Sequence, residues 1–401
     1  MMKTTLSATQ FEDELYRNIL PFWMKNAPDE ENGGFYGGIT NSLEVRNEVP
    51  RTAISCTRFL WTFSHAYRTV PEEKYLVIAH KAFNYLKAVF WDRDFGGLYW
   101  SVNQHGQVVG ERKHHYAQAF GIYGLSEYFK ATGNEESRRL AHSLFDLLET
   151  QAFDPSYGGY IEGRARDWSP LPDMRLGADD LNCQKSMNTT LHIMEAYTNL
   201  VAVARDGSVA ERLREIILQF QNHIIGPANH FWLYFDSDWS PLSDHISYGH
   251  DIEGSWLLME AAEALGDAAL SSAATASALA LAEAVFKEGL RPDHAVIHED
   301  SPTGLINPNL EWWPQAEAVV GFYNAYQLTG DQKFEAAASH SWAFIQDHLV
   351  DPVHGGWFKR LYPDGSVNRQ SLKAGPWEGP YHEARMCFEM IKRLTNQTEP
   401  V

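Results

Sequence analysis

The segment Phe153-Asp154-Pro155-Ser156-Tyr157-Gly158-Gly159 belongs to a short element that recurs six times along the chain. Fuller copies stand at 91–97 and 350–356. A glycine pair followed by aromatic or β-branched residues is typical of small β-hairpins or extended loops. The six centres are Gly33-Gly34-Phe35-Tyr36, Gly96-Gly97-Leu98-Tyr99, Gly158-Gly159-Tyr160-Ile161, Phe231-Trp232-Leu233-Tyr234, Ala295-Val296-Ile297-His298 and Gly355-Gly356-Trp357-Phe358. We therefore expect six similar loops, spread over the whole chain.

Helical periodicity fills the sequence between these loops, two helices at a time. Connections within a pair are short and rich in helix breakers, as in Thr132-Gly133-Asn134 and Thr329-Gly330-Asp331, whereas the loops with glycine pairs are long. The predicted helices span 8–25, 51–69, 73–90, 116–132, 135–151, 185–204, 208–225, 251–265, 267–288, 313–329, 331–348 and 380–395. Six helical hairpins without polar end caps predict an all-α protein, a closed (α/α)6 barrel of twelve helices with short β-hairpin loops over one mouth.

Composition limits the kind of protein and its ligand. The 401 residues carry 44% hydrophobic residues and no linker or low-complexity tract, so we expect one domain over 1–401. A net charge of -19 would repel nucleic acid and anionic membranes, which favours a small neutral ligand. Three scattered cysteines suggest neither disulfides nor a thiolate zinc site. The first residues lack a long apolar segment and no stretch looks long enough to span a membrane, so we expect a cytoplasmic protein. We also expect a monomer or weak homodimer.

Polar and titratable residues gather where each helix following a long loop begins. In Ile246-Ser247-Tyr248-Gly249-His250-Asp251-Ile252-Glu253, His250 and Asp251 are expected at the N-cap and Glu253 in the first turn. The other five starts lie at 52–58, 114–118, 185–192, 312–317 and 380–385. Because these six helices should form the inner ring, their N-termini should share one bowl, which predicts a common active site.

Histidine and arginine spacing within these helices indicates which residues share a face. Asn188 and His192 stand at i and i+4, and His382 and Arg385 at i and i+3. Arg58 precedes the apolar run Phe59-Leu60-Trp61, so it is either a buried arginine paired to a carboxylate or a group that stabilises an anion.

Two acid–base schemes fit these residues, and a barrel that only binds sugars is a third reading. An inverting glycosidase would use two opposed carboxylates, for which Asp180, Glu253 and Glu317 are available. Reversible deprotonation beside a carbonyl would instead use His250 and His382 as bases on two faces, with Arg58 holding the enediolate oxygen. We expect these two histidines to face one another across the bowl.

The same motifs give little support for a metal or an organic cofactor. His250-Asp251-x-Glu253 lacks the paired histidines of a zinc helix, and the adjacent His114 and His115 cannot easily aim at one ion. Neither a phosphate-binding loop, a nucleophile elbow nor a dinucleotide fingerprint is present. We therefore expect no metal and no cofactor.

The motifs together resemble the N-acylglucosamine 2-epimerase superfamily, and within it the cellobiose 2-epimerase branch. The resemblance covers nearly the whole chain. Its most specific pieces are Thr57-Arg58-Phe59-Leu60-Trp61-Thr62-Phe63-Ser64, Arg166-Asp167-Trp168, Lys185-Ser186-Met187-Asn188-Thr189, 246–253, Trp312-Trp313-Pro314-Gln315-Ala316-Glu317-Ala318 and Trp377-x-x-Pro380-Tyr381-His382.

This resemblance implies an (α/α)6 barrel that reversibly converts the reducing-end glucose of β-1,4-linked disaccharides to mannose, without cofactor. It implies that His250 and His382 form the acid/base pair acting through a cis-enediolate, that His192 is also essential and that Arg58 stabilises the intermediate. Sugar-contacting or supporting residues fall at Tyr116, Asn188, Glu253, Trp313 and Trp377, and the carboxylates Asp180 and Glu317 complete the candidate substrate-binding set. An aldose–ketose isomerase of the mannose, glucose and fructose type, or an N-acylglucosamine 2-epimerase, is the alternative within the superfamily.

Overall fold

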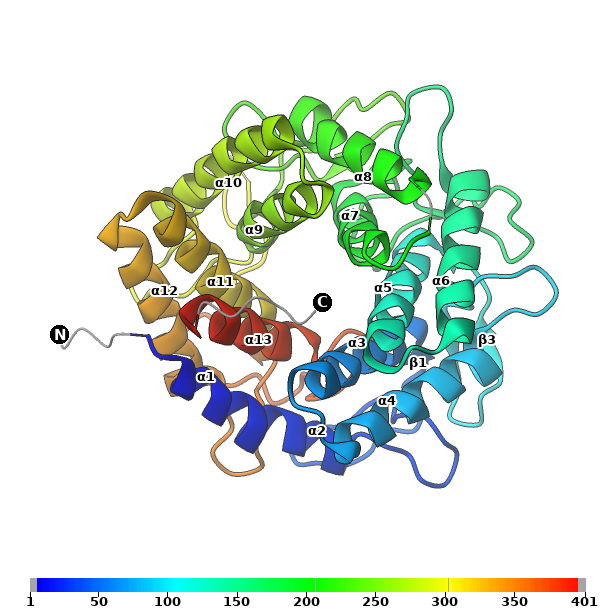
Figure 1. Cartoon of the computed structure of the whole chain (residues 1–401). Helices are drawn as coiled ribbons and strands as arrows, with labels where there is room; N and C mark the ends of the chain where they lie inside the picture. Colours follow the sequence, from blue (N-terminus) through cyan, green and yellow to red (C-terminus); the bar gives the residue numbers. More distant parts are fainter. Residues whose placement is uncertain (1–5, 206, 302, 396–401) are drawn as a thin grey trace.

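The computed structural model describes residues 6–205, 207–301 and 303–395 as two concentric rings of helices (Figure 1). The inner ring contains α3 (Ala53–Thr69), α5 (His115–Thr132), α7 (Met187–Val201), α9 (Tyr248–Leu265), α11 (Trp312–Thr329) and α13 (Tyr381–Thr395). The outer ring contains α1 (Ala8–Asp13) continued by α2 (Leu20–Asn26), then α4 (Glu73–Tyr85), α6 (Glu135–Leu147), α8 (Ser208–Gln219), α10 (Ala268–Glu288) and α12 (Gln332–Phe344). The predicted (α/α)6 barrel of twelve helices is confirmed in the described part of the chain.

Local π-helical turns mark the outer ring. One joins α1 to α2 at Glu14–Ile19, so that these two segments form one continuous helix. Four others end outer helices, at Leu86–Phe90, Leu148–Ala152, Phe220–Ile224 and Ile345–Leu349. Each of these four leads directly into a long loop.

Short turns at one end of the barrel join inner helices to outer ones. Gly133, Gly266 and Gly330 end α5, α9 and α11 with φ of 68°, 63° and 69°, a left-handed conformation that favours glycine. Asp267 and Asp331 then cap the next helices through their side chains. The chain therefore passes from an inner helix to the next outer helix within a few residues.

Long loops at the other end carry the β-structure that closes the ring. Each glycine-pair element forms a narrow bridged loop, with pairs such as Trp91↔Leu98, Phe153↔Tyr160 and Val350↔Trp357. Five inner helices are preceded by a strand that pairs with a strand of the next long loop; the antiparallel pairs are β1 (Arg51–Thr52) with β2 (Ser101–Val102), β4 (Lys113–His114) with β5 (Gly163–Arg164), β6 (Lys185–Ser186) with β7 (Tyr234–Phe235), β8 (Ile246–Ser247) with β9 (Glu299–Asp300) and β10 (Leu310–Glu311) with β11 (Arg360–Leu361). β2 also pairs with β3 (Val108–Gly110). A bridge between Ile39 and Ala374 joins the first loop to the last, so the ring is closed.

Buried ion pairs fix successive loops to one another. Lys113 bonds Asp92 at 2.9 Å and Lys185 bonds Asp154 at 2.8 Å, and both lysines are fully buried. Each aspartate also accepts backbone N–H groups of its own loop, at positions two and three residues further on. Because a buried charge is tolerated only when it is paired and hydrogen-bonded, the loop aspartates and the lysines before the next inner helices depend on each other.

Close approach of a tryptophan explains why Gly159, the second glycine of its loop, is a glycine. Its φ is 76°, and a Cβ at this position would lie 2.3 Å from the ring of Trp239. Gly133 has a φ of 68° but open space around it. We predict that Gly159→Ala lowers the free energy of unfolding by several kcal/mol, since strain and overpacking add, and that Gly133→Ala lowers it by only about 1–2 kcal/mol. Urea unfolding of both variants measures this, and equal losses would contradict it.

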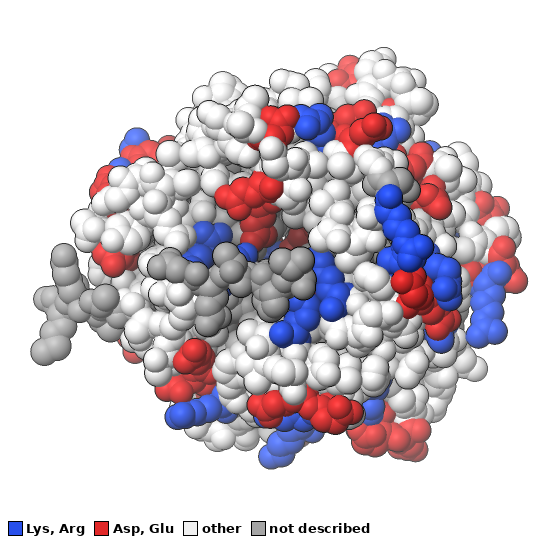
Figure 2. Space-filling view, viewed as in Figure 1, with Lys and Arg blue, Asp and Glu red and all other residues white. Residues whose placement is uncertain are grey.

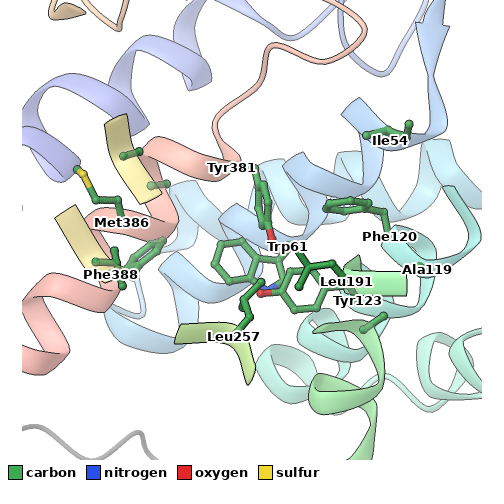
Figure 3. Packing of buried hydrophobic residues seen from close by; sticks show 14 of the residues in the cluster. Ile54, Trp61, Ala119, Phe120, Tyr123, Leu191, Leu257, Tyr381, Met386 and Phe388 are labelled. Carbon is green, nitrogen blue, oxygen red and sulfur yellow. The ribbon is translucent and has the colours of Figure 1, made fainter. Parts of the chain in front are cut away.

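The core lies between the inner helices below the mouth. Trp61, Phe120, Tyr123 and Tyr381 come from α3, α5 and α13 and meet edge to face or stacked, with ring centroids 5.2 to 6.3 Å apart (Figure 3). Leu191 and Leu257 extend this packing to α7 and α9. The inner helices are therefore held by aromatic contacts that leave their N-terminal ends at one mouth.

Two details of the expectations are wrong. Helix α9 begins at Tyr248 with Ser247 at its N-cap, so His250 and Asp251 lie inside the first turn instead of capping it. By length and composition alone, α10 is apolar enough to cross a membrane, although no such segment was expected. In this fold α10 packs against α9 and α11 as a member of the outer ring. A single domain over 1–401 stays a prediction, because both chain ends lie outside the described residues.

Candidate active site

Three histidines at the mouth share one arrangement of their ring nitrogens. Nδ1 of His192 lies 2.9 Å from Glu195 Oε2, Nδ1 of His382 lies 2.7 Å from Glu317 Oε1, and Nδ1 of His250 lies 2.8 Å from Ser247 Oγ. No described group hydrogen-bonds Nε2 of any of the three. Each imidazole is therefore oriented through Nδ1 and keeps Nε2 for another partner.

Two neighbouring histidines, His114 and His230, differ in this respect, whereas His115 bonds the carbonyl of Ile161 through Nδ1 and has a buried Nε2 without a partner among the described residues. His114 uses both ring nitrogens, one toward the N–H of Tyr116 and one toward the carbonyl of Met174. His230 likewise contacts Asp251 and Glu288 with its two nitrogens. These two side chains are held within the fold, which separates them from the three candidate catalytic histidines.

Burial keeps the candidate bases neutral. It lowers the pKa of His250 well below the ordinary histidine value, and the nearby His192 and His298 add to this effect. Burial also lowers the pKa of His382, with Arg58 and Arg385 contributing. A neutral imidazole with a free Nε2 is the form that accepts a proton.

Trp313 contacts both candidate bases. Its ring centroid is 4.6 Å from that of His250 and 5.7 Å from that of His382. Helix α11 alone separates α9 from α13 around the ring, so the two histidines come from helices that are not diametrically opposite (Figure 1). That their side chains face one another across the bowl stays a prediction. Both imidazoles contact the Trp313 indole.

Arg58 is a buried cation without a counter-charge. Its guanidinium donates to the carbonyl of Trp377 at 2.8 Å and to the hydroxyl of Tyr116 at 3.1 Å, and it lies over the ring of Phe120 at 4.7 Å. No carboxylate of the described residues lies within ion-pair distance, and Nε has no partner in this part of the chain. Of the two readings open for Arg58, the paired arginine is therefore excluded, and the site offers an unneutralised positive charge to an anion.

The remaining predicted sugar-binding residues line the mouth beside His250. A pocket there is lined by Asn188, Asp180, Tyr234 and Glu299 together with His250. Oδ1 of Asn188 is buried without a partner among the described residues, and Asp180 accepts from the hydroxyl of Tyr234 at 2.9 Å. Trp377 contacts Tyr116 on the other side, with ring centroids 5.9 Å apart. The structure thus places all the predicted site residues at or just below one mouth.

Arg385 lies beneath these residues and binds three carboxylates. It contacts Glu195, Glu253 and Glu317, the last at 2.7 Å. Burial and the charge of Glu317 raise the pKa of Glu253 to about 7, although Arg385 opposes this. Sequence reasoning places Arg385 on the face of His382 but does not single out Glu195, which stands three residues after His192 and could have been found by that spacing.

The carboxylate geometry argues against an inverting glycosidase. Oxygens of Glu253 and Glu317 lie within 4.8 Å of one another, and both carboxylates contact Arg385. Inverting enzymes separate their two carboxyl groups by about 6.5–9.5 Å to admit a water molecule. Asp180 is engaged at the rim by the N–H of Gly177 and by Tyr234.

Glu253, Glu317 and His382 also form the one cluster of described residues with ligand atoms close enough to share a metal ion. The guanidinium of Arg385 already supplies positive charge to both carboxylates, and Nδ1 of His382 is bonded to Glu317. We predict that prolonged treatment with a chelator leaves the enzymatic rate unchanged. Loss of activity that one divalent ion restores would contradict this.

Comparison with known proteins agrees with the geometry. Residues 34–385 match the family model of N-acylglucosamine 2-epimerase (GlcNAc 2-epimerase). A cellobiose 2-epimerase of Bacteroides fragilis is 44% identical over 387 residues, covering 95% of this chain and 98% of the relative. The solved cellobiose 2-epimerase of Spirochaeta thermophila superposes with a TM-score of 0.89 at 37% identity, covering 97% of this chain and 96% of the other.

A D-mannose isomerase of Marinomonas mediterranea is more distant, with 23% identity over 394 residues, covering 94% of this chain and 95% of the relative. The matched residues of the family model include all eleven residues predicted for the site. The chain therefore belongs to the N-acylglucosamine 2-epimerase family.

Proposed function

We propose that this protein is a carbohydrate 2-epimerase that interconverts the reducing-end glucose of β-1,4-linked disaccharides with mannose, as in cellobiose to glucosyl-mannose and lactose to epilactose. The observation that carries the proposal is the set of three imidazoles with engaged Nδ1 and free Nε2, beside an arginine without a carboxylate partner. The cellobiose 2-epimerase relatives support the choice of substrate over the mannose isomerase alternative.

The reaction needs one proton removed and one returned at C2 of the open-chain sugar. Nε2 of His250 or His382 takes the C2 proton, the C–H electron pair forms the C1=C2 bond, and the carbonyl pair moves onto O1. Arg58 stabilises the resulting enediolate charge. The other histidine first takes up a proton from solvent on its free Nε2 and then delivers it to the opposite face of C2. The C1=C2 electron pair forms the new C–H bond and O1 re-forms the carbonyl, which gives the epimer.

Supporting roles follow from the positions of the remaining residues. Trp313 and Trp377 offer aromatic faces to the sugar rings, and Asn188, Asp180 and Tyr116 offer hydrogen-bonding groups at the mouth. His192 brings a third free Nε2, next to Tyr116 at 4.8 Å between ring centroids. No step uses a cofactor. We also propose a cytoplasmic location and a monomer or weak homodimer.

Product analysis tests the function directly. Incubation with cellobiose should give glucosyl-mannose with its linkage intact, resolved by chromatography beside lactose, mannose and N-acetylglucosamine as alternative substrates. Free glucose as the main product would support a glycosidase instead. Saturable binding without any change in the sugar would indicate a barrel that only binds.

A further inference from the structure

Arg385 joins four inner helices at the centre of the barrel. It extends from α13 to Glu195 on α7, Glu253 on α9 and Glu317 on α11. Only 2% of its surface is exposed to solvent. It also donates to the hydroxyl of Tyr381 at 2.5 Å. Tyr381 packs among the aromatic residues of the core (Figure 3), so the guanidinium has a fixed position.

Two of the carboxylates that bind Arg385 also contact Nδ1 of a histidine of the site. Glu195 binds Arg385 and Tyr381 through Oε1 and receives Nδ1 of His192 on Oε2. Glu317 receives both Arg385 and Nδ1 of His382 on Oε1. An ionised carboxylate can only accept, so each histidine carries its proton on Nδ1 and exposes a lone pair at Nε2.

His250 is held differently. Its Nδ1 contacts the hydroxyl of Ser247, which can either donate or accept. His250 can therefore change tautomer where it stands, whereas His192 and His382 cannot without breaking a bond to a carboxylate. Among the three candidate catalytic histidines, Nδ1 therefore faces a carboxylate only in the two whose carboxylate partner also binds Arg385.

The groups around Glu195 favour its ionised form, which can only accept hydrogen bonds. Burial alone would raise the pKa of Glu195, but Arg385, His192 and Tyr381 lower it to about 2. Other titratable groups around this centre include Glu253, Glu317, Tyr116, Tyr123, Glu260, His382 and Arg58. Burial raises the pKa of Glu253 and of Glu317 although Arg385 opposes it, so Glu195 is the carboxylate of the three whose pKa is lowered.

Acidic and basic side chains surround the centre of the opposite face of the barrel, where the short turns lie (Figure 2). Glu195 and Arg385 line a cavity open on that side, together with Trp61, Tyr123 and Glu260. The cavity is therefore a neighbour of the Arg385 cluster, and the ion pairs of this cluster form part of its wall.

We infer that Arg385 is a positioning residue: through Glu195 and Glu317 it fixes His192 and His382 with Nδ1 protonated and Nε2 free for the sugar. The expected loss of kcat rests on the proposed function. The tautomers of His192 and His382 do not, because they exist in the protein without substrate. It assigns to Arg385 and Glu195 a role in catalysis without contact to the reacting atoms.

Glu195→Gln is the sharpest test. The single amide oxygen would be needed by Arg385 and Tyr381, so the amide NH₂ would face Nδ1 of His192 and drive its proton to Nε2. We expect ¹⁵N-histidine NMR to show His192 as the Nδ1–H tautomer in the wild type and the Nε2–H tautomer in the variant, with His192→Asn assigning the signal. We expect kcat to fall by about 10²-fold with little change in KM, since the wrong tautomer affects the chemical step.

Glu127→Gln is the matched control. Glu127 is a buried glutamate that contacts Nδ1 of His65 at 3.0 Å, outside the contacts of Arg385. We expect it to leave kcat and the His192 signal unchanged. Arg385→Lys, a second variant, should disturb the signals of both His192 and His382, because an ammonium cannot reproduce the forked contacts.

Unchanged tautomers in both Glu195→Gln and Arg385→Lys would overturn the inference. A wild type that shows the predicted tautomers but does not epimerise cellobiose would instead contradict the proposed function alone. The inference would also be overturned if Glu195→Gln and Glu127→Gln lost kcat equally and the His192 signal did not change. Glu195 would then have only a structural role.

Discussion

His250→Asn and His382→Asn should each abolish epimerisation, with kcat lower by at least about 10²–10⁴-fold. Inversion at C2 needs a proton to leave one face of the enediolate and another to reach the opposite face. His250 and His382 both contact Trp313, and each is bonded through Nδ1 and keeps a free Nε2. Removal of either leaves only half of the proton transfer, so no epimer can form.

Solvent isotope tracing measures the two halves separately. In deuterated water the wild type should place deuterium at C2 of the epimer. A variant that lacks only the reprotonating base should still exchange C2 of the starting sugar without inverting it. His65→Asn is a suitable control, because His65 also pairs with a carboxylate but lies away from the mouth. Near-normal epimerisation by both Asn variants would make His192 the principal base.

The ring architecture could be predicted because its signals are local and repeated. Glycine pairs such as Gly158-Gly159 mark loops that must turn with positive φ, and Gly133, Gly266 and Gly330 mark the ends of inner helices. Closure could be inferred from six repeats, but the contact that achieves it, Ile39 with Ala374, joins residues that no local pattern connects.

The start of α9 shows the limit of local patterns. His250 and Asp251 have the composition of a cap, yet Ser247 is the N-cap residue, because β8 pairs with β9 and sets where the chain enters the helix. Asp251 instead accepts from His230 and from the N–H of Phe231. A capping rule cannot anticipate partners that are 20 and 21 residues away in sequence and are brought close only by the fold.

The identity of the mouth residues was predictable, but their electrostatics were not. Nothing near Arg58 in sequence shows whether a carboxylate will reach it, and the answer depends on helices far along the chain. Arg385 lies three residues after His382, but its three carboxylates come from α7, α9 and α11. The two buried arginines therefore look alike in sequence and have opposite surroundings in the structure.

This difference leads to a prediction for Arg58→Met. Loss of the guanidinium should lower kcat by about 10²–10³-fold, the usual effect of removing one group that stabilises an oxyanion. The free energy of unfolding should stay at or above that of the wild type. Two hydrogen bonds, to Trp377 and Tyr116, are lost at about 1 kcal/mol each, but a buried charge without a counter-ion is removed, and that charge costs several kcal/mol.

Arg385→Met provides the comparison, because it should lower the free energy of unfolding by about 3–5 kcal/mol by leaving buried carboxylates without their cation. Urea unfolding and steady-state kinetics of the two variants together test the assignment. If Arg58→Met were as destabilised as Arg385→Met, Arg58 would be an ordinary paired arginine of the core. If it kept its kcat, the enediolate oxygen would have to be held by another group, and the hydroxyl of Tyr116, which contacts the same guanidinium, would be the next residue to substitute.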